Sequence, residues 1–237
     1  MKIEVLFPEI CNLFGDLMNV EYLKRSCPEI EVINTGLKDE PLFVSEKPDM
    51  IYMGTMSESS QELVIKKLLP YKNRIMQLIA ENALFLITGN ALEVFGKTIE
   101  NEDGTKIDGI GVFSFTAKRK MMARYNSLYL GSFGEMDIVG FKSQFTFAYG
   151  ADETKPLFKT VRGDGMNKET KAEGLRYNNF MATYVIGPLT VLNPPFASYL
   201  LKMMGAENCD VAYHDAAYEV YNSRVKEYKD PNTGFIY

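Results

Sequence analysis

The sequence contains few of the residues that bind metals, form disulfides or supply imidazole chemistry. Its three cysteines, Cys11, Cys27 and Cys209, are widely separated and form no Cys-x-x-Cys pair. No metal-ligand spacing is present, so we expect no metal and no cofactor, and a disulfide framework is not expected either. The single histidine, His214, has apolar neighbours at helical spacing. That setting favours a partly buried or surface histidine over a catalytic base.

Long apolar runs and an excess of basic residues are also missing. No run approaches the roughly 20 apolar residues that a membrane-spanning helix needs. The start of the chain, MKIEVLFPEI, has the pattern of a strand and not of a signal peptide. The net charge is −5, whereas nucleic-acid binders normally carry a basic excess. We therefore expect a soluble cytoplasmic protein with no nucleic-acid partner and no membrane span.

Two other features of the composition have a bland and a functional interpretation. The one basic cluster, Lys118, Arg119, Lys120 and Arg124, lies among apolar residues. Such a cluster is more often a solvated face than an anion site. The 13 methionines are expected to fill the core, with an adaptable partner surface as the alternative.

The first half of the chain alternates strand-like and helix-like segments. With 237 residues, 46% of them hydrophobic, the chain is long enough to bury a sizeable core. Hydrophobic patterning predicts strands over 3–7, 31–35, 49–54 and 83–88, and helices over 16–26, 57–69 and 71–82. Alternation of this kind predicts an α/β fold, with a mostly parallel, doubly wound, flavodoxin-like sheet and helices on both faces.

The second half has a different texture. After the turn signal at Asp103-Gly104, short β-rich runs at 109–115, 127–133, 137–141 and 144–150 predict antiparallel additions to the sheet. A further strand at 181–188, helices at 194–204 and 210–228, and a tail at 230–237 complete the chain. The tail is expected to hold a turn followed by three exposed apolar residues. No linker or internal repeat is present, so residues 1–237 are expected to form a single domain.

Chemistry in a doubly wound sheet is expected at the carboxyl ends of its strands. Segment 83–96 offers a buried strand, a sharp turn at Gly89-Asn90 and then a short helix. This is the layout of a nucleophile elbow, in which a strained turn lifts one side chain to a helix N-terminus. Glycine and asparagine adopt such a turn at little cost, yet neither is a practical nucleophile.

Several motifs, in order, resemble those of class I (triad-type) glutamine amidotransferases of the cobyric acid synthase-like branch. They lie at 6–19 (LFPEICNLFGDLMN), 49–61 (DMIYMGTMSESSQ), 103–113 (DGTKIDGIGVF) and 173–201 (EGLRYNNFMATYVIGPLTVLNPPFASYLL). Within this branch the chain is most similar to the glutaminase subunits of lipid II isoglutaminyl synthases. The resemblance covers about residues 1–201 and leaves a C-terminal helix and tail, 210–237, outside it.

The chain departs from the family where the family performs its chemistry. In register with the elbow motif Cys-Gly-Gly-x-Gln, the nucleophile position is Gly89 and the glutamine position is Glu93. The family base, the histidine of Tyr-Leu-His-Gly-Pro, aligns with Ile186. We accordingly expect no catalytic residues and a relict pocket. Its expected members are Gly54, Thr55, Thr88, Gly89, Asn90, Glu93, Arg124, Gln144 and Ile186, with Asp16 as a retained acid.

The resemblance implies a partner of the Mur-ligase-like, ATP-dependent class, because the family's glutaminase chain delivers ammonia to such an enzyme. We therefore interpret the chain as a non-hydrolytic subunit or regulatory module of an amidating ligase. Rescue by the Cys11 thiol is one alternative, although a small buried hydrophobe is the expected role of that residue. The Thr88 hydroxyl has no base nearby and is expected to bond locally to the backbone.

Two further hypotheses assign a function to the pocket itself. The helix start after the elbow, together with Asn90, Arg124 and Gln144, would bind an amino acid or a carboxylate without cleaving it. Alternatively, Asp16 or Glu93 would serve as the general base of an altered reaction. The carboxylates are few and scattered, so the sequence favours this last hypothesis least.

Overall fold

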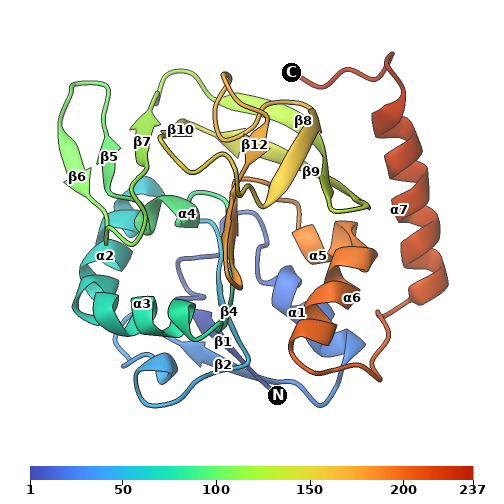
Figure 1. Ribbon diagram of the computed structural model, residues 1–237, viewed down its shortest axis with the longest axis horizontal. Coiled ribbons are helices and arrows are strands. Elements are labelled where there is room, and N and C mark those ends of the chain that lie inside the picture. The colour runs from blue at the N-terminus through green and yellow to red at the C-terminus, as the bar shows by residue number, and fades with distance from the viewer. Residues whose placement is uncertain (237) are drawn as a thin grey trace.

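A six-stranded sheet forms the centre of the computed structural model, which describes residues 1–236 (Figure 1). Its strand order is β13-β14-β4-β3-β1-β2, and every neighbouring pair is parallel except β13 with β14. The strands are β1 (Lys2–Leu6), β2 (Glu31–Thr35), β3 (Met50–Met53), β4 (Leu84–Thr88), β13 (Leu175–Tyr177) and β14 (Phe180–Thr183). Strands β3 and β4 are buried at every position, as expected of parallel strands covered on both faces.

Helices cover both faces of this sheet (Figure 1). One face packs against α2 (Glu58–Leu68), α3 (Lys72–Ala80) and α4 (Ala91–Val94), and the other against α1 (Met18–Ser26), α5 (Leu189–Leu192) and α6 (Pro194–Met203). Alternate strand residues serve the two cores: Phe85 and Ile87 face the first, Leu84 and Leu86 the second. Short 3-10 turns lie at Leu42–Val44 and Leu69–Tyr71. The fold class predicted from the sequence is confirmed.

The remaining strands form two separate four-stranded sheets. One has the order β10-β7-β5-β6 and contains β5 (Thr98–Glu100), β6 (Lys106–Asp108), β7 (Thr116–Arg119) and β10 (Thr146–Tyr149). The other has the order β12-β11-β8-β9 and contains β8 (Tyr125–Phe133), β9 (Met136–Gln144), β11 (Phe158–Arg162) and β12 (Ala172–Glu173). Neighbouring strands in these two sheets are antiparallel except β5 with β7, so the predicted antiparallel additions are present. Apart from β13, they form sheets of their own and do not extend the central sheet.

The strand predicted at 109–115 is wrong, because this segment is a loop. Its backbone amides bond to the end of α4 and the residues that follow it: Ile110 N–H donates to the Val94 carbonyl at 2.9 Å, and Gly111 N–H to the Gly96 carbonyl at 2.9 Å. Gly109 passes so close that an added Cβ would lie 2.3 Å from the Gly96 carbonyl oxygen. The apolar side chains are buried by this close approach and not by a strand ladder.

Helix α7 (His214–Lys229) lies alongside β8 and β9 at one end of the molecule (Figure 1). Tyr221, Tyr228 and Phe235 are buried between the helix, the tail and this sheet. The tail was expected to expose its last three apolar residues. Phe235 instead packs under the Arg162 guanidinium, 4.0 Å from the ring centroid, while Ile236 is exposed. Tyr237 lies outside the described residues.

A disulfide joins Cys27, at the end of α1, to Cys209, which precedes α7. The expectation that the cysteines would not pair is therefore wrong. The two residues are 182 positions apart in sequence, yet their Cα atoms lie 5.4 Å apart. Sequence spacing carries no information about such a contact, because only the packing of α1 against the segment after α6 brings the two cysteines together.

Candidate functional site

A pocket opens where β3, β4 and β14 end, at the carboxyl edge of the parallel strands. Its cavity volume is about 100 Å³, several times the space that one water molecule needs. The predicted site residues that line it are Thr55, Gly89, Asn90, Glu93, Arg124, Gln144 and Ile186. Gly54, Thr88 and Asp16 are buried next to it and do not line it. The structure therefore brings the predicted residues together at one place.

Gly89 and Thr55 make the closest approach in the site. Gly89 has φ +62°, the left-handed conformation expected of an elbow residue. A Cβ placed on Gly89 would lie 2.6 Å from Thr55 Oγ1 and 2.8 Å from Thr55 Cγ2. Carbon atoms in contact normally lie about 3.5–4.0 Å apart. The Thr55 side chain therefore occupies the space into which any side chain on Gly89 would have to project.

Asp16 holds Thr55 in this position. The Thr55 hydroxyl donates to Asp16 Oδ1 at 2.7 Å, and the Thr88 hydroxyl donates to the same oxygen at 3.3 Å. The other carboxylate oxygen accepts from the Phe14 N–H at 3.0 Å. The Tyr52 hydroxyl lies 3.0 Å from Thr88 Oγ1 and donates to the Asp16 carbonyl. The retained acid thus serves as a buried anchor for neighbouring side chains.

Ile186, which was expected at the position of the family's histidine, also lines the pocket. It is almost fully buried and exchanges both backbone hydrogen bonds with Phe141 of β9, at 3.0 and 3.1 Å. Its aliphatic side chain offers no proton acceptor. An apolar residue here also avoids the cost of burying an imidazole without partners.

No thiol and imidazole face each other in the part of the chain that the structure describes. Cys11 is buried with its sulfur 4.0 Å from Met56 Sδ, and it does not line the pocket. Burial raises the pKa of the Cys11 thiol far above its usual value, and the Glu9 and Asp16 carboxylates add to this effect. His214 lies on α7 and contacts Asp215 and Tyr218.

Glu93 is the one carboxylate fully buried in the pocket wall. Its Oε2 atom accepts from Gln61 Nε2 at 2.9 Å, and Gln61 Oε1 accepts in turn from Arg119 Nη2 at 2.6 Å. Burial raises the pKa of Glu93 to about 7, while the Gln61 hydrogen bond and the Arg119 charge oppose this shift. The Tyr184 hydroxyl interacts with the Glu93 carboxylate and also opposes this rise in pKa.

Gln61 and Arg119 were not predicted as site residues. Gln61 is the last residue of the family-like motif at 49–61, and its place in that motif could have identified it as a site residue. Arg119 was expected on a solvated face with Lys118, Lys120 and Arg124, but it is buried and also donates to Asn101 Oδ1 at 3.1 Å. Alternation along β7 explains the difference, because Ala117 and Arg119 point inward while Lys118 points to solvent.

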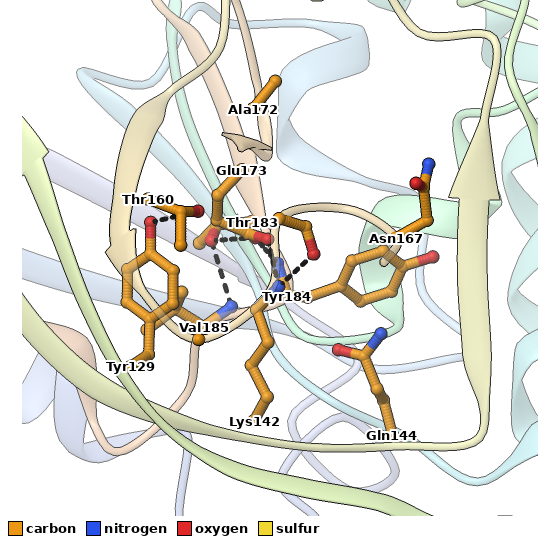
Figure 2. A network of polar contacts seen from close by, with 12 residues as sticks. Tyr129, Lys142, Gln144, Thr160, Asn167, Ala172, Glu173, Thr183, Tyr184 and Val185 are labelled. Atoms are coloured by element: carbon orange, nitrogen blue, oxygen red, sulfur yellow. Dashed lines mark hydrogen bonds and ion pairs between the residues drawn. The ribbon is translucent and has the colours of Figure 1, made fainter. Parts of the chain in front are cut away.

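Gln144 Oε1 has no hydrogen-bond partner among residues 1–236, whereas Glu93 Oε1 and the Tyr184 hydroxyl interact with each other and make no other hydrogen bond in that range. Gln144 uses its Nε2 atom to donate to the Thr146 carbonyl at 2.6 Å, which leaves its oxygen free. Figure 2 shows the Tyr184 ring beside the Gln144 side chain. Tyr184 was not predicted as a site residue, although it begins the matched motif that contains Ile186.

A buried ion pair fixes the end of β14 that carries Tyr184 (Figure 2). Lys142 of β9 donates to the Glu173 carboxylate of β12 and to the Gly165 carbonyl, at 2.6 Å for the latter. Glu173 Oε1 accepts from the Thr183 hydroxyl and from the Tyr184 N–H, each at 2.8 Å. This network connects the β12-β11-β8-β9 sheet to the end of β14 in the central sheet, next to the pocket residue Tyr184.

The Asn90 side chain is fully occupied by the backbone of the β3–α2 loop. Asn90 Oδ1 accepts from the Met56 N–H at 3.0 Å, and Nδ2 donates to the Met56 carbonyl at 2.7 Å. Helix α4 has only four residues, Ala91–Val94. The predicted anion site at a helix start with Asn90 is therefore not supported, since that side chain is not free to bind a ligand. Arg124 stacks on Phe145 at the rim, 4.5 Å from the ring centroid.

The fold of this chain is similar to that of known proteins. The arrangement of sheets matches class I glutamine amidotransferase structures. A crystal structure of a glutamine amidotransferase aligns over 85% of this chain and 98% of its own, with a TM-score of 0.55 and 13% identity. A glutamine amidotransferase from Thermotoga maritima aligns over 97% of this chain and 92% of its own, with a TM-score of 0.51 and 10% identity. At such identities the likeness concerns the fold alone.

Residues 2–192 match the CobB/CobQ-like glutamine amidotransferase domain, and the chain belongs to this family. Two curated relatives are GatD subunits of the glutamine-hydrolysing lipid II isoglutaminyl synthase. The Staphylococcus aureus subunit is 26% identical over 193 residues, 81% of this chain and 79% of the relative. The Streptococcus pneumoniae subunit is 24% identical over 208 residues, 85% of this chain and 79% of the relative.

Membrane-spanning helices and clustered metal ligands are both missing from the described residues. None of the helices within residues 1–236 combines the length and the apolar character that crossing a membrane requires. In the same range, no group of three or more His, Cys, Asp or Glu side chains is placed to hold a metal ion.

Replacing Gly89 with alanine should destabilise the fold more than the same change at another left-handed glycine. Gly134 has φ +59° and no atom within 4 Å of an added Cβ, so Gly134→Ala should cost only about 1 kcal/mol of unfolding free energy. Gly89→Ala must also displace Thr55, which should raise its cost to about 2–4 kcal/mol. Urea denaturation measures both values. When both alanine changes are made in a Thr55→Gly background, most of the difference between their costs should disappear. Equal costs for the two alanine variants in the wild-type background would contradict the steric argument.

Glu93→Gln should stabilise the protein at alkaline pH and not at acid pH. The raised pKa means that the folded protein holds this proton more tightly than the unfolded chain. The resulting stabilisation is present below the ordinary value of 4.5 and is lost as the pH rises through about 7. Glutamine stays neutral throughout, so the variant should gain up to about 3 kcal/mol over wild type at about pH 8 and almost nothing at about pH 4. Glu207→Gln, at an exposed position, is the matched control.

Proposed function

We propose that this chain is a degenerate glutamine amidotransferase, acting as a non-hydrolytic subunit or regulatory module of an ATP-dependent amidating ligase. The observation that carries the proposal is the Thr55 side chain, packed where a side chain on Gly89 would project. At the family's nucleophile position the chain therefore lacks both the thiol and the room for one. At the base position it has Ile186, which accepts no proton.

The magnitude of the loss supports this proposal. Thiol attack on an amide needs a thiolate with a base within hydrogen-bond reach. Removing a nucleophile and its base together costs on the order of 10⁶ in rate, or ~8 kcal/mol of barrier. Cys11 is an unsuitable replacement, because its buried thiol is hard to ionise and does not reach the pocket.

The partner of the proposed module is a Mur-ligase-like, ATP-dependent enzyme of peptidoglycan-precursor or cobyric acid amidation. The likeness to GatD subunits supports this class of partner, and with it a cytoplasmic site of action. Exposed apolar side chains beside the pocket mouth suit a docking surface. Leu13 lines the rim, and Met121 and Met122 lie on the loop that leads to Arg124.

Wild-type protein should release no ammonia from glutamine above a heat-killed control. Restoring the family residues with Gly89→Cys and Ile186→His should also fail, because the introduced cysteine side chain would overlap Thr55. Adding Thr55→Gly to those two changes should permit measurable release, detected with a coupled glutamate dehydrogenase assay. Ammonia release by the unaltered protein would contradict the proposal.

The tagged chain should co-purify from its host with an ATP-dependent ligase, identified by mass spectrometry. Met122→Glu, at a side chain 93% exposed near the pocket mouth, should weaken this recovery by placing a charge on the docking surface. Val220→Glu, at an exposed position on α7, is the control and should leave recovery unchanged. Recovery of the chain alone, under conditions that preserve ligase complexes, would argue against a subunit role.

A further inference from the structure

A second pocket lies along β13, the strand at one edge of the central sheet. Its cavity volume is about 90 Å³, and it shares no lining residue with the pocket at the ends of β3, β4 and β14. Residues of β13, of the 109–115 loop and of a loop at 151–155 line it. The proposed function makes no use of this second pocket.

The inner wall of the second pocket is apolar. Phe115 and Leu175 are buried there, and Phe113 meets Tyr177 edge to face, with ring centroids 6.3 Å apart. Walls of this kind hold a ligand mainly through its hydrocarbon groups. An apolar cavity of about 150 Å³ takes up benzene. A cavity of about 90 Å³ therefore suits a branched aliphatic group better than an aromatic ring.

Two opposite charges lie at the rim of this pocket, on one turn of the chain. Lys155 N–H donates to the Asp152 carbonyl at 3.2 Å, and residues at the two ends of such a turn have Cα atoms within about 7 Å. The Thr154 N–H and hydroxyl donate to Asp152 Oδ1 at 3.0 and 2.6 Å. These hydrogen bonds, with a smaller contribution from the Lys155 charge, lower the pKa of Asp152. The carboxylate is therefore ionised at neutral pH, with its second oxygen exposed at the rim.

The Lys155 ammonium group makes no hydrogen bond and no ion pair at contact distance within residues 1–236. It lies over the Tyr177 ring, 5.9 Å from the centroid, and so stays beside the cavity. The Lys155 carbonyl accepts from the Arg176 N–H at 3.1 Å, which holds the turn against the outer edge of β13. A cation and a carboxylate are thus positioned together above an apolar cavity, and neither neutralises the other by direct contact.

We propose that this second pocket binds a small aliphatic α-amino acid such as leucine or valine. The carboxylate of the ligand pairs with Lys155, its ammonium group pairs with Asp152, and its side chain enters the apolar cavity. A ligand with a carboxylate alone would be repelled by Asp152, and an amine alone would be repelled by Lys155. An α-amino acid carries both charges close together and satisfies both residues. The inference goes beyond the proposed function and does not depend on it.

The test is a titration of the full chain with three ligands that share one hydrocarbon group, followed by amide chemical shifts in two-dimensional NMR. The ligands are L-leucine, 4-methylpentanoate, which lacks the amino group, and 3-methylbutylamine, which lacks the carboxylate. Leucine should bind saturably and shift signals from the 109–115 and 151–155 loops. Each analogue should bind about threefold to fivefold more weakly, because partly exposed ion pairs contribute modestly. Glycine, which has no side chain, should not saturate.

Two variants assign the charges of the ligand to their partners. In Lys155→Met, leucine and 3-methylbutylamine should bind about equally, because the partner of the carboxylate is gone. Asp152→Asn keeps an oxygen that accepts from Thr154 and removes the charge, so leucine and 4-methylpentanoate should bind about equally. Lys202→Met, at an exposed position on α6, is the matched control and should retain the wild-type preference.

Equal affinities of the wild type for the three ligands, a leucine titration that does not saturate, or a wild-type preference retained by both rim variants would overturn the inference. Ammonia release from glutamine bears on the proposed function alone, so the two failures are distinguishable.

Discussion

The contact between Thr55 and Gly89 determines what this site can contain. Gly89 must be glycine because its backbone is left-handed and because Thr55 leaves no room for a Cβ atom. Thr55 stays in place because its hydroxyl donates to Asp16, whose carboxylate also accepts from the Thr88 hydroxyl and the Phe14 N–H. Asp16, Thr55 and Gly89 thus form one packed unit at the start of the pocket wall. The left-handed elbow conformation is adopted here by a glycine, which takes it at little cost.

Polar side chains of the pocket are organised by two buried relays. On one wall Arg119, Gln61 and Glu93 form a chain of hydrogen bonds between β7, α2 and α4. On the other, Lys142 and Glu173 fix the residues that precede Tyr184. Each relay satisfies most of its own buried polar groups. A buried ion pair contributes little net stability, but it specifies where the neighbouring strands end.

Much of this arrangement could be predicted from the sequence, because local pattern and family motif agree there. The run 83–88 followed by Gly89 predicted the buried strand and the left-handed turn, and the structure places the predicted pocket residues around that turn. Segment 109–115 misled the prediction because burial against the residues after α4 produces the same apolar pattern as a strand. Arg119 was not predicted because a cluster of basic residues does not reveal which member points inward.

The disulfide between Cys27 and Cys209 closes most of the chain into one covalent loop. Cys27 leaves the ribosome early and finds its partner only when Cys209 has been made, 182 residues later. Domains generally fold as units, and the two cysteines lie together only where α1 packs against the segment after α6 in the folded domain. The pocket residues from Thr55 to Ile186 then lie within one covalent ring, while Leu13, Phe14 and α7 lie outside it.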